Sequence, residues 1–236
     1  MGRSKDLATL KSGLSIDGTL TTTSTGTNLT SNSYNVVKIQ TDKDDNGSND
    51  DAILQFTTGS SNTVKGELRY DESESMFEIG HGDNQGHVRI DSSGRVTKPN
   101  NPSFSAYING SNPTITSNPT KIPYNAVRWD IGNNFDETNH RYIAPVAGVY
   151  HFTINHNVYA LSDDQYFRTR VYVNGSSYSL LGYIRARGGG DHTVNDSILI
   201  NLSAADYVEV YTSSADTSYS MSAANNWNSF SGYLVG

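Results

Sequence analysis

The clearest pattern in this sequence is an alternation of residue types in its second half. From residue 150 to 158 the even positions are aromatic or aliphatic apart from His156, and the odd positions from 151 to 157 are His, Thr or Asn. A period of two predicts a β-strand with one face on a core and one in water. Similar runs predict strands over 167–173 and 194–202, with a tight hairpin turn at Asn174-Gly175. Because His156 falls in the inward series, we expect it to be a hydrogen-bonded core residue.

The first half of the chain predicts strands that are shorter and poorer in apolar residues. They are expected over 34–40, 52–57, 64–70, 75–80, 87–91 and 94–97, with turns at Asn46-Gly47, Gly59-Ser60 and Ser93-Gly94. So small an apolar content makes a poor independent domain. We therefore expect a homotrimer, in which each chain supplies one face of a shared core.

The N-terminal segment, residues 1–15, allows two interpretations. Ser4 is a suitable N-cap for a short helix, and Leu7, Leu10 and Leu14 would lie on one side of it. A helix of this length is marginal in water by itself, so it needs a larger body to pack against. It is either an attachment segment whose leucines pack against copies of themselves or against a larger body, or a frayed terminus.

Proline residues mark the boundary between two parts of the chain. Pro99 and Pro102 lie within five residues of sequence, where they prevent strand pairing and stiffen the backbone. The expected organisation is an attachment segment over 1–15, a β-rich shaft over 16–97, a linker over 98–101 and a globular head over 102–236.

Composition excludes several classes of protein. The 236 residues are 35% hydrophobic, contain no cysteine and carry a formal net charge of −7. Short strands rich in Ser, Thr, Asn and Gly favour an all-β fold, and the absence of cysteine excludes disulfides and thiolate metal sites. No basic stripe suggests a nucleic acid as partner, and no apolar run predicts a signal peptide or a membrane span.

The stretch from 124 to 154 resembles the signature of a known family. The pattern consists of an aromatic residue at 124, Asp130, aromatic residues at 135 and 142, and then Gly148-x-Tyr150-x-Phe152. It is similar to the signature of the globular head of complement component 1, subcomponent q. Three more pieces agree in chain order: 104–106, 202–210 and 229–234. The sequence departs from the family's pattern at Tyr124 and Tyr142, where Phe is usual, and at Ala205, where Gly is usual.

The resemblance implies a ten-stranded jelly roll like that of tumour necrosis factor, with two packed five-stranded sheets and threefold assembly. It also implies recognition of a protein or glycan surface without catalysis. The first and last strands would lie together at the base, so residue 102 and Gly236 would be neighbours and the opposite loops would be free. Receptor-binding candidates in those loops are Asp163, Asp164, Arg185, Arg187 and His192.

One acidic turn suggests a possible calcium site. Asp42, Asp44 and Asn46 supply oxygen ligands at alternate positions, and Gly47 permits a sharp bend. However, Ile53 stands where a calcium loop would end in Glu, so a solvated hairpin tip is the alternative. No other cofactor is expected. No Gly-x-Ser-x-Gly elbow or phosphate-binding loop suggests an enzyme.

Together these features predict a bacteriophage virion protein: a tail fibre with a trimeric slender β shaft followed by a jelly-roll head. The turns from Gly66 to Val96 also loosely resemble segments of tail-fibre proteins of marine bacterial viruses. The head would attach to a host cell-surface protein or glycan. Two alternatives remain, namely a capsid head-fibre or decoration protein with a structural role, and a tailspike that degrades polysaccharide.

Overall fold

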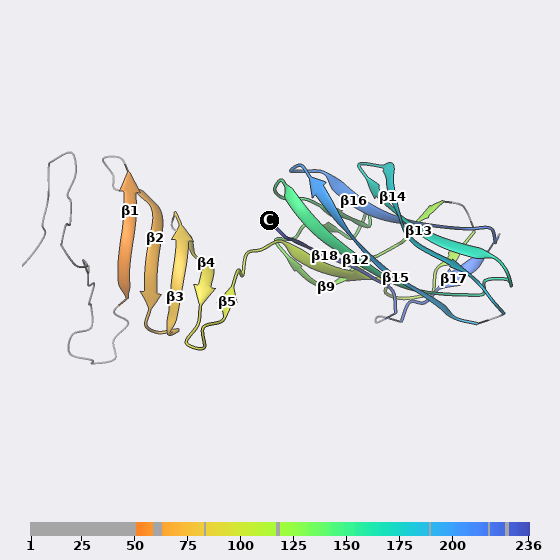
Figure 1. Cartoon of the computed structure of the whole chain (residues 1–236), viewed down its shortest axis with the longest axis horizontal. Coiled ribbons are helices and arrows are strands. Elements are labelled where there is room, and N and C mark those ends of the chain that lie inside the picture. The colour runs from red at the N-terminus through yellow and green to blue at the C-terminus, as the bar shows by residue number, and fades with distance from the viewer. Residues whose placement is uncertain are drawn as a thin grey trace, which may run out of the picture.

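A computed structural model describes residues 51–58, 63–82, 84–116, 119–188, 190–216, 218–224 and 227–236, and every regular element in these ranges is a β-strand. The all-β prediction is therefore confirmed. The expected helix within residues 1–15, the strand over 34–40 and the calcium ligands Asp42, Asp44 and Asn46 lie outside the described residues. The described strands form two bodies, a small sheet and a head, which one stretch of chain connects (Figure 1).

The small sheet is an antiparallel meander of five strands in chain order. Its strands are β1 (Ala52–Thr58), β2 (Thr63–Asp71), β3 (Met76–His81), β4 (Asn84–Ile90) and β5 (Val96–Thr97). Aspartates fix two of its turns. The carboxylate of Asp71 accepts hydrogen bonds from Ser73 Oγ and Glu74 N, and that of Asp91 from Ser93 N and Arg95 N. The five strands predicted over 52–97 are thus confirmed, with ends shifted by a few residues.

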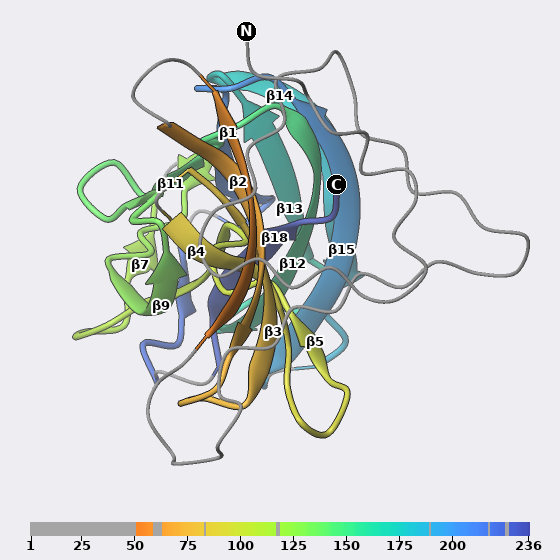
Figure 2. The same cartoon turned by 90° about the vertical axis from the view of Figure 1, so that its left-hand side faces the viewer.

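The connection after the small sheet leads to the base of the head. Leu234 N donates to Pro102 O at 3.0 Å, and Asn101 Nδ2 donates to Leu234 O at 2.8 Å. The C terminus accordingly lies at the end of the head that faces the small sheet (Figure 1; Figure 2). This confirms the expectation that residue 102 and the C terminus are neighbours.

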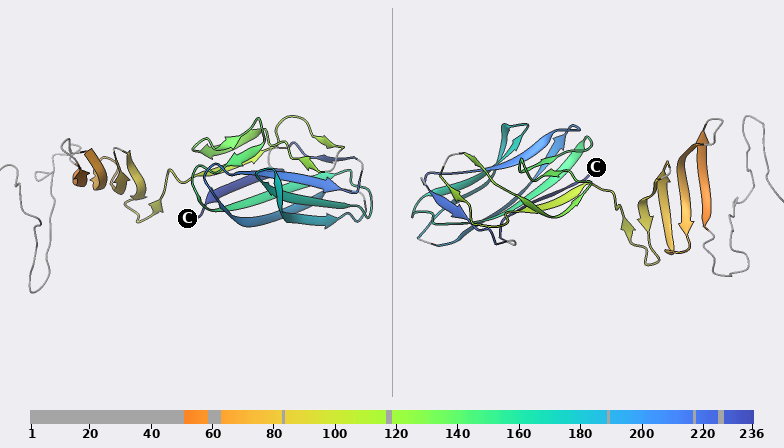
Figure 3. Two further views of the ribbon diagram at one scale, coloured as in Figure 1. Left: turned by 90° about the horizontal axis from the view of Figure 1, so that it is seen from above. Right: turned by 180° about the vertical axis from the view of Figure 1, so that it is seen from behind.

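The head is a sandwich of two antiparallel sheets (Figure 3). The first head sheet has the order β9 (Ala126–Ile131), β6 (Ser103–Tyr107), β18 (Ser229–Leu234), β12 (Gly148–Tyr159) and β15 (His192–Leu202). The second head sheet has the order β10 (Phe135–Asp136), β11 (Arg141–Ile143), β16 (Tyr207–Ser214), β13 (Tyr166–Val173) and β14 (Ser176–Arg185). Three short strands are added to these ten: β7 (Thr114–Ile115), β8 (Thr120–Lys121) and β17 (Tyr219–Met221).

The separated pieces of the family signature meet in the core of the head. Phe104 from the first strand stacks on Tyr142 with ring centroids 4.5 Å apart, and its edge contact with Phe230 from the last strand is at 5.0 Å. All five even positions from Tyr150 to Val158 are fully buried, as the alternation predicts. Large aromatic side chains bury much apolar area, so this cluster stabilises the contact between the two sheets.

Tight turns position the strand ends of the head. Asn174 and Gly175 have φ angles of 51° and 75°, the left-handed pair that a two-residue hairpin requires. Asp130 accepts hydrogen bonds from Asn134 N at 3.0 Å and Phe135 N at 2.8 Å, and so closes the turn between β9 and β10. Ala205 adopts φ 70°, a conformation that glycine adopts at lower cost.

Candidate functional site: three exposed surfaces

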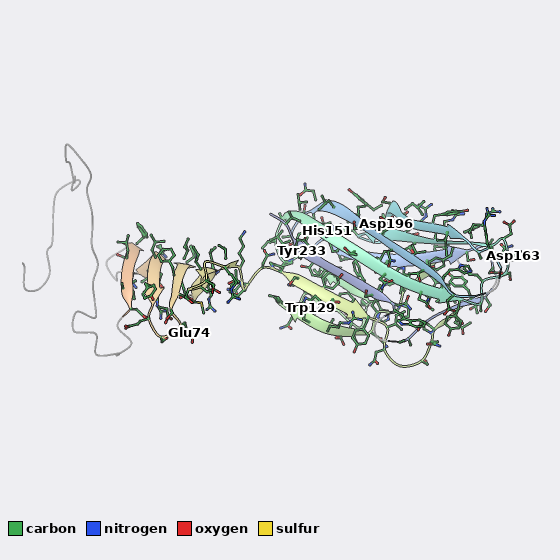
Figure 4. All side chains as sticks on the ribbon, turned by 60° about the horizontal axis from the view of Figure 1, so that its bottom comes forward. Glu74, Trp129, His151, Asp163, Asp196 and Tyr233 are labelled. Atoms are coloured by element: carbon green, nitrogen blue, oxygen red, sulfur yellow. The ribbon has the colours of Figure 1, made fainter. Side chains whose placement is uncertain are left out.

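The distal loops, residues 161–165 and 185–188, lie at the end of the head farthest from the small sheet, where Figure 4 labels Asp163. Backbone hydrogen bonds join them: Asp164 N donates to Ala186 O at 2.9 Å, and Ala186 N donates to Gln165 O at 2.7 Å. Asp163 Oδ1 also accepts from Gly188 N at 2.6 Å. The two predicted contact loops therefore form one joined surface.

The charged candidates in the distal loops are partly paired. Arg185 Nη1 lies 2.7 Å from Asp164 Oδ1, and this hydrogen bond raises the pKa of Arg185. The structure thus brings Asp163, Asp164 and Arg185 together. Arg187 is exposed beside them, whereas His192 begins β15 and is half-buried, with its Nε2 covered and without a hydrogen-bond partner in the described structure.

A second surface lies near the base of the head. Trp129, Ile131 and Tyr233 are exposed on the outer face of the first head sheet, with Trp129 at 52%. They line a depression of about 440 Å³, in which the His151 and Tyr233 rings are 5.3 Å apart. Figure 4 shows Trp129, His151 and Tyr233 toward the end that faces the small sheet.

The neighbouring edge of the sandwich is also apolar. On β14, the last strand of the second head sheet, Tyr178, Leu180 and Tyr183 are exposed. Leu199 on β15 is 60% exposed, but it is the register partner of His151 and so belongs to the face of the first head sheet. Exposed apolar groups gathered in this way commonly mark a contact with another protein surface. The head therefore carries one apolar patch on a sheet face and a different one on a sheet edge.

The small sheet has a third exposed surface, and its two faces differ sharply. Strand register places Leu54, Leu68, Ile79 and Val88 in one row across the sheet. The next row of the same face holds Ala52, Tyr70, Phe77, Ile90 and Val96. On the opposite face Arg69 is 2.6 Å from Asp51 and 2.8 Å from Asp71, and Arg89 is 2.9 Å from Glu78.

Two kinds of feature are absent from the described part of the chain. It contains no group of three or more histidine, aspartate or glutamate side chains arranged to hold a metal ion. Nor does it contain a helix long and apolar enough to cross a bilayer.

Sequence reasoning missed the exposed aromatic residues. Trp129 lies within the signature stretch and Trp227 precedes the last strand, yet neither was expected at the surface. A usable signal was available: both of the chain's tryptophans lie outside the predicted inward series. The pattern alone does not say whether such a residue packs on a partner strand or faces solvent.

The architecture of the head is that of a jelly roll, a fold shared by many binding domains. The family model described as the C1q domain matches residues 103–235. The chain belongs to the C1q domain family. C1q and tumour necrosis factor-like domains are typically non-enzymatic binding domains, and they form homotrimers.

Two curated relatives come from Bacillus subtilis (strain 168). The "Uncharacterized protein YqcC" is 34% identical over 99 residues, which are 39% of this chain and 26% of that protein. The "Phage-like element PBSX protein XkdV" is 33% identical over 100 residues, again 39% of this chain but 14% of that protein. The chain thus matches only a minor part of each relative's length.

Solved structures with a similar fold include three domains. The globular domain of zebrafish complement 1qA has a TM-score of 0.44 and 16% identity, covering 58% of this chain and 98% of that one. Eiger TNF from S. frugiperda has a TM-score of 0.47 and 8% identity, covering 58% and 94%. Murine APRIL has a TM-score of 0.45 and 6% identity, covering 57% and 99%.

Proposed function

We propose that this protein is a homotrimeric fibre on the exposed surface or tail of a bacteriophage virion. Residues 1–15 attach it to another virion protein, 16–97 form the shaft, 98–101 the linker and 102–236 the head. The head binds a host cell-surface protein or glycan without catalysis. The observation that carries this proposal is the uncovered apolar face of the small sheet.

That apolar face needs a partner. Six of its large side chains are between 38% and 62% exposed: Leu54, Phe56, Tyr70, Phe77, Ile79 and Val96. An antiparallel sheet ordinarily turns its apolar face to a core and its polar face to water. Here the polar face already has its ion pairs. The face available for burial is the apolar one, and identical copies supply identical apolar faces.

The head supports three copies rather than two. Domains of its family form homotrimers. Its two apolar patches, on the face at Trp129 and Tyr233 and on the edge at Tyr178 and Leu180, are different surfaces. When identical chains contact one another through two different surfaces, the copies form a closed ring if the rotation from one copy to the next divides a full turn evenly. Because the small sheet is joined to the head, it would share the same threefold axis.

The orientation of the head supports recognition by the distal loops. Both the linker and the C terminus lie at the base of the head, so the distal loops face away from the shaft (Figure 1). Arg187 supplies an exposed charge there, beside the paired Asp164 and Arg185. The 33% identity with a protein of a phage-like element supports placement on a virion.

The test is competition for host cells between the purified full-length chain and intact virus. The wild-type protein should sediment as a trimer and reduce virus adsorption. Arg187→Glu should compete less well. Lys65→Glu, which makes the same charge change on an exposed position of the small sheet, should compete like the wild type.

Three results would overturn the proposal. A stable folded monomer at micromolar concentration contradicts the trimer. Normal infection by particles that lack the protein, together with no competition, favours the decoration role. Loss of viscosity of host polysaccharide on addition of the protein indicates a tailspike enzyme.

A further inference from the structure

The sandwich has two outer faces, and the second head sheet provides one of them (Figure 3). The contacts of the proposed trimer use the other outer face, at Trp129 and Tyr233, and the edge at Tyr178 and Leu180. The strands β13 and β16 pair with each other in the middle of the second head sheet, between β11 and β14. Their outward side chains therefore face solvent in the proposed assembly.

Alternation identifies the outward side chains of these two strands. On β13, Phe167, Thr169 and Val171 are fully buried between the sheets, so the even positions point outward. On β16, Val208 and Val210 are buried in the same way. The outward side chains are mostly aromatic or charged: Tyr166, Arg168, Arg170, Tyr172, Tyr207, Glu209, Tyr211 and Ser213.

The charges around this face leave two arginines without a carboxylate. Three other cations have a carboxylate within 3.2 Å: Lys121 with Glu209, Arg141 with Asp136 and Arg185 with Asp164. Among the described residues, neither Arg168 nor Arg170 forms an ion pair. A chain with a formal net charge of −7 thus carries two adjacent, uncompensated positive charges on the middle of one sheet face.

Tyrosine rings flank the two arginines. The guanidinium carbon of Arg168 lies 4.0 Å from the centre of the Tyr166 ring, and its Nε is covered without a hydrogen-bond partner in the described structure. Arg170 has Tyr211 as its register partner, and the rings of Tyr211 and Tyr172 are 4.1 Å apart. A guanidinium that packs on a ring keeps its planar donors in one orientation. Arg168 is therefore ordered before an anion binds.

The spacing of the arginines suits a polymer with repeated negative charges. They are two residues apart on one strand, so their Cα atoms are separated by about 6.8 Å and their side chains point the same way. A guanidinium binds a carboxylate through two parallel hydrogen bonds. The tyrosines add flat apolar faces with a hydroxyl at the end, which match a sugar ring with apolar C–H faces and polar substituents.

We propose that this face binds an acidic polysaccharide of the host surface, in which sugars that carry a carboxylate recur along the chain. Arg168 and Arg170 pair with carboxylates of the polymer, and Tyr172 and Tyr211 pack against its sugar rings. This rests on the proposed function and deepens it, since it names the class of glycan. It assigns that glycan to a sheet face and leaves the distal loops to other contacts.

The experiment is calorimetry on the full-length oligomer with three polyuronates: oligogalacturonate, alginate and hyaluronate. At least one should bind saturably, and neutral dextran of similar length should not bind. The affinity should fall as sodium chloride is added, because salt screens exposed charges. Polyphosphate carries repeated negative charges without sugar rings, so it should bind more weakly than the polyuronate.

Matched variants locate the site. Arg168→Gln and Arg170→Gln each remove one positive charge and should weaken polyuronate binding by about fivefold. Arg170→Lys keeps the charge but loses the paired donors, so it should recover part of the loss. Lys65→Gln removes a positive charge from an exposed position of the small sheet and should bind like the wild type. Sedimentation of each variant shows whether the oligomer is intact.

The outcomes separate this inference from the proposed function. The inference is wrong if none of the three polyuronates binds, if polyphosphate binds as tightly, or if both glutamine variants bind like the wild type. It is also wrong if both variants alter the sedimentation of the oligomer, because the face is then a contact between copies. Competition with virus for host cells is measured separately. The fibre function stands if the wild type competes without binding a polyuronate, and falls if it binds one but does not compete.

Discussion

The hydroxyl of Tyr124 is hydrogen-bonded to Nε2 of His156, and both side chains are completely buried. On the other side of the imidazole, Nδ1 lies 3.1 Å from Thr169 Oγ1. Burial lowers the pKa of His156 to about 3 and raises that of Tyr124. A neutral imidazole that accepts from Tyr124 and donates to Thr169 satisfies all three groups.

This buried imidazole makes stability depend on pH. The ordinary pKa of His is about 6.5, so below that pH the unfolded chain binds a proton that the folded chain does not. The free energy of unfolding should therefore fall on acidification, by up to ~1.4 kcal/mol per pH unit from this residue.

Denaturant titrations at several pH values test this dependence, with His156→Gln as control. Between pH 6.5 and about 4 the change in the free energy of unfolding should come mainly from His156. The aspartates with lowered pKa values, such as Asp71 and Asp136, reduce the free energy of unfolding only at lower pH. A wild type and variant with parallel pH profiles there would contradict the assignment.

Tyr124 and Tyr142 stand where the family usually has Phe. Replacing each of them with Phe should change the free energy of unfolding in different directions. The Tyr142 hydroxyl is buried without a hydrogen-bond partner in the described structure, so Tyr142→Phe should be neutral or stabilise by up to ~1 kcal/mol. Tyr124→Phe removes the partner of His156 and should destabilise by about 1–2 kcal/mol. Chemical denaturation of the two variants and the wild type compares their free energies of unfolding. Equal effects would mean that the hydrogen bond to His156 contributes nothing.

Ala205 offers a stabilising substitution. Its φ of 70° is held by a hydrogen bond from its own N to Ala144 O at 2.8 Å, and alanine in this region is strained by ~1–2 kcal/mol. Glycine removes the strain but adds freedom to the unfolded chain, so Ala205→Gly should raise the free energy of unfolding by about 0.5–1 kcal/mol. Ala204→Gly makes the same chemical change at the preceding residue, which is outside the positive-φ group, and should not stabilise. A destabilised Ala205→Gly variant in chemical denaturation would contradict this reasoning.

The apolar face of the small sheet should carry the association of the shaft. A carboxylate at Ile79, which is 42% exposed in the isolated chain, would be buried without a partner between copies. Ile79→Asp should therefore weaken association between the copies and lower the melting temperature of the oligomer at a given protein concentration. Thr97→Asp adds the same charge at an exposed position on the opposite face and should behave like the wild type. Sedimentation and melting at two concentrations compare them. Identical behaviour would place the shaft contact elsewhere.

The sequence by itself determined the elements that depend on local order. Alternation from Tyr150 to Val158 specified which side of β12 is buried, because side chains point to opposite faces in turn. Asn174-Gly175 specified a hairpin, since both residues tolerate positive φ. The spaced aromatic residues of the signature specified the family, and they also showed that the chain departs from the family's usual residues at Tyr124, Tyr142 and Ala205.

Only the tertiary structure decided what remains uncovered and what is paired. Asp164 neutralises Arg185 because two loops 21 residues apart meet at the tip. Trp227 is held at the surface of the head because Asn228 binds a strand 71 residues away. The apolar face of the small sheet is visible as a continuous surface only once the register aligns Leu54 with Leu68 and Ile79. A period of two assigns residues to a face, but whether that face is covered depends on contacts distant in sequence, which local pattern does not encode.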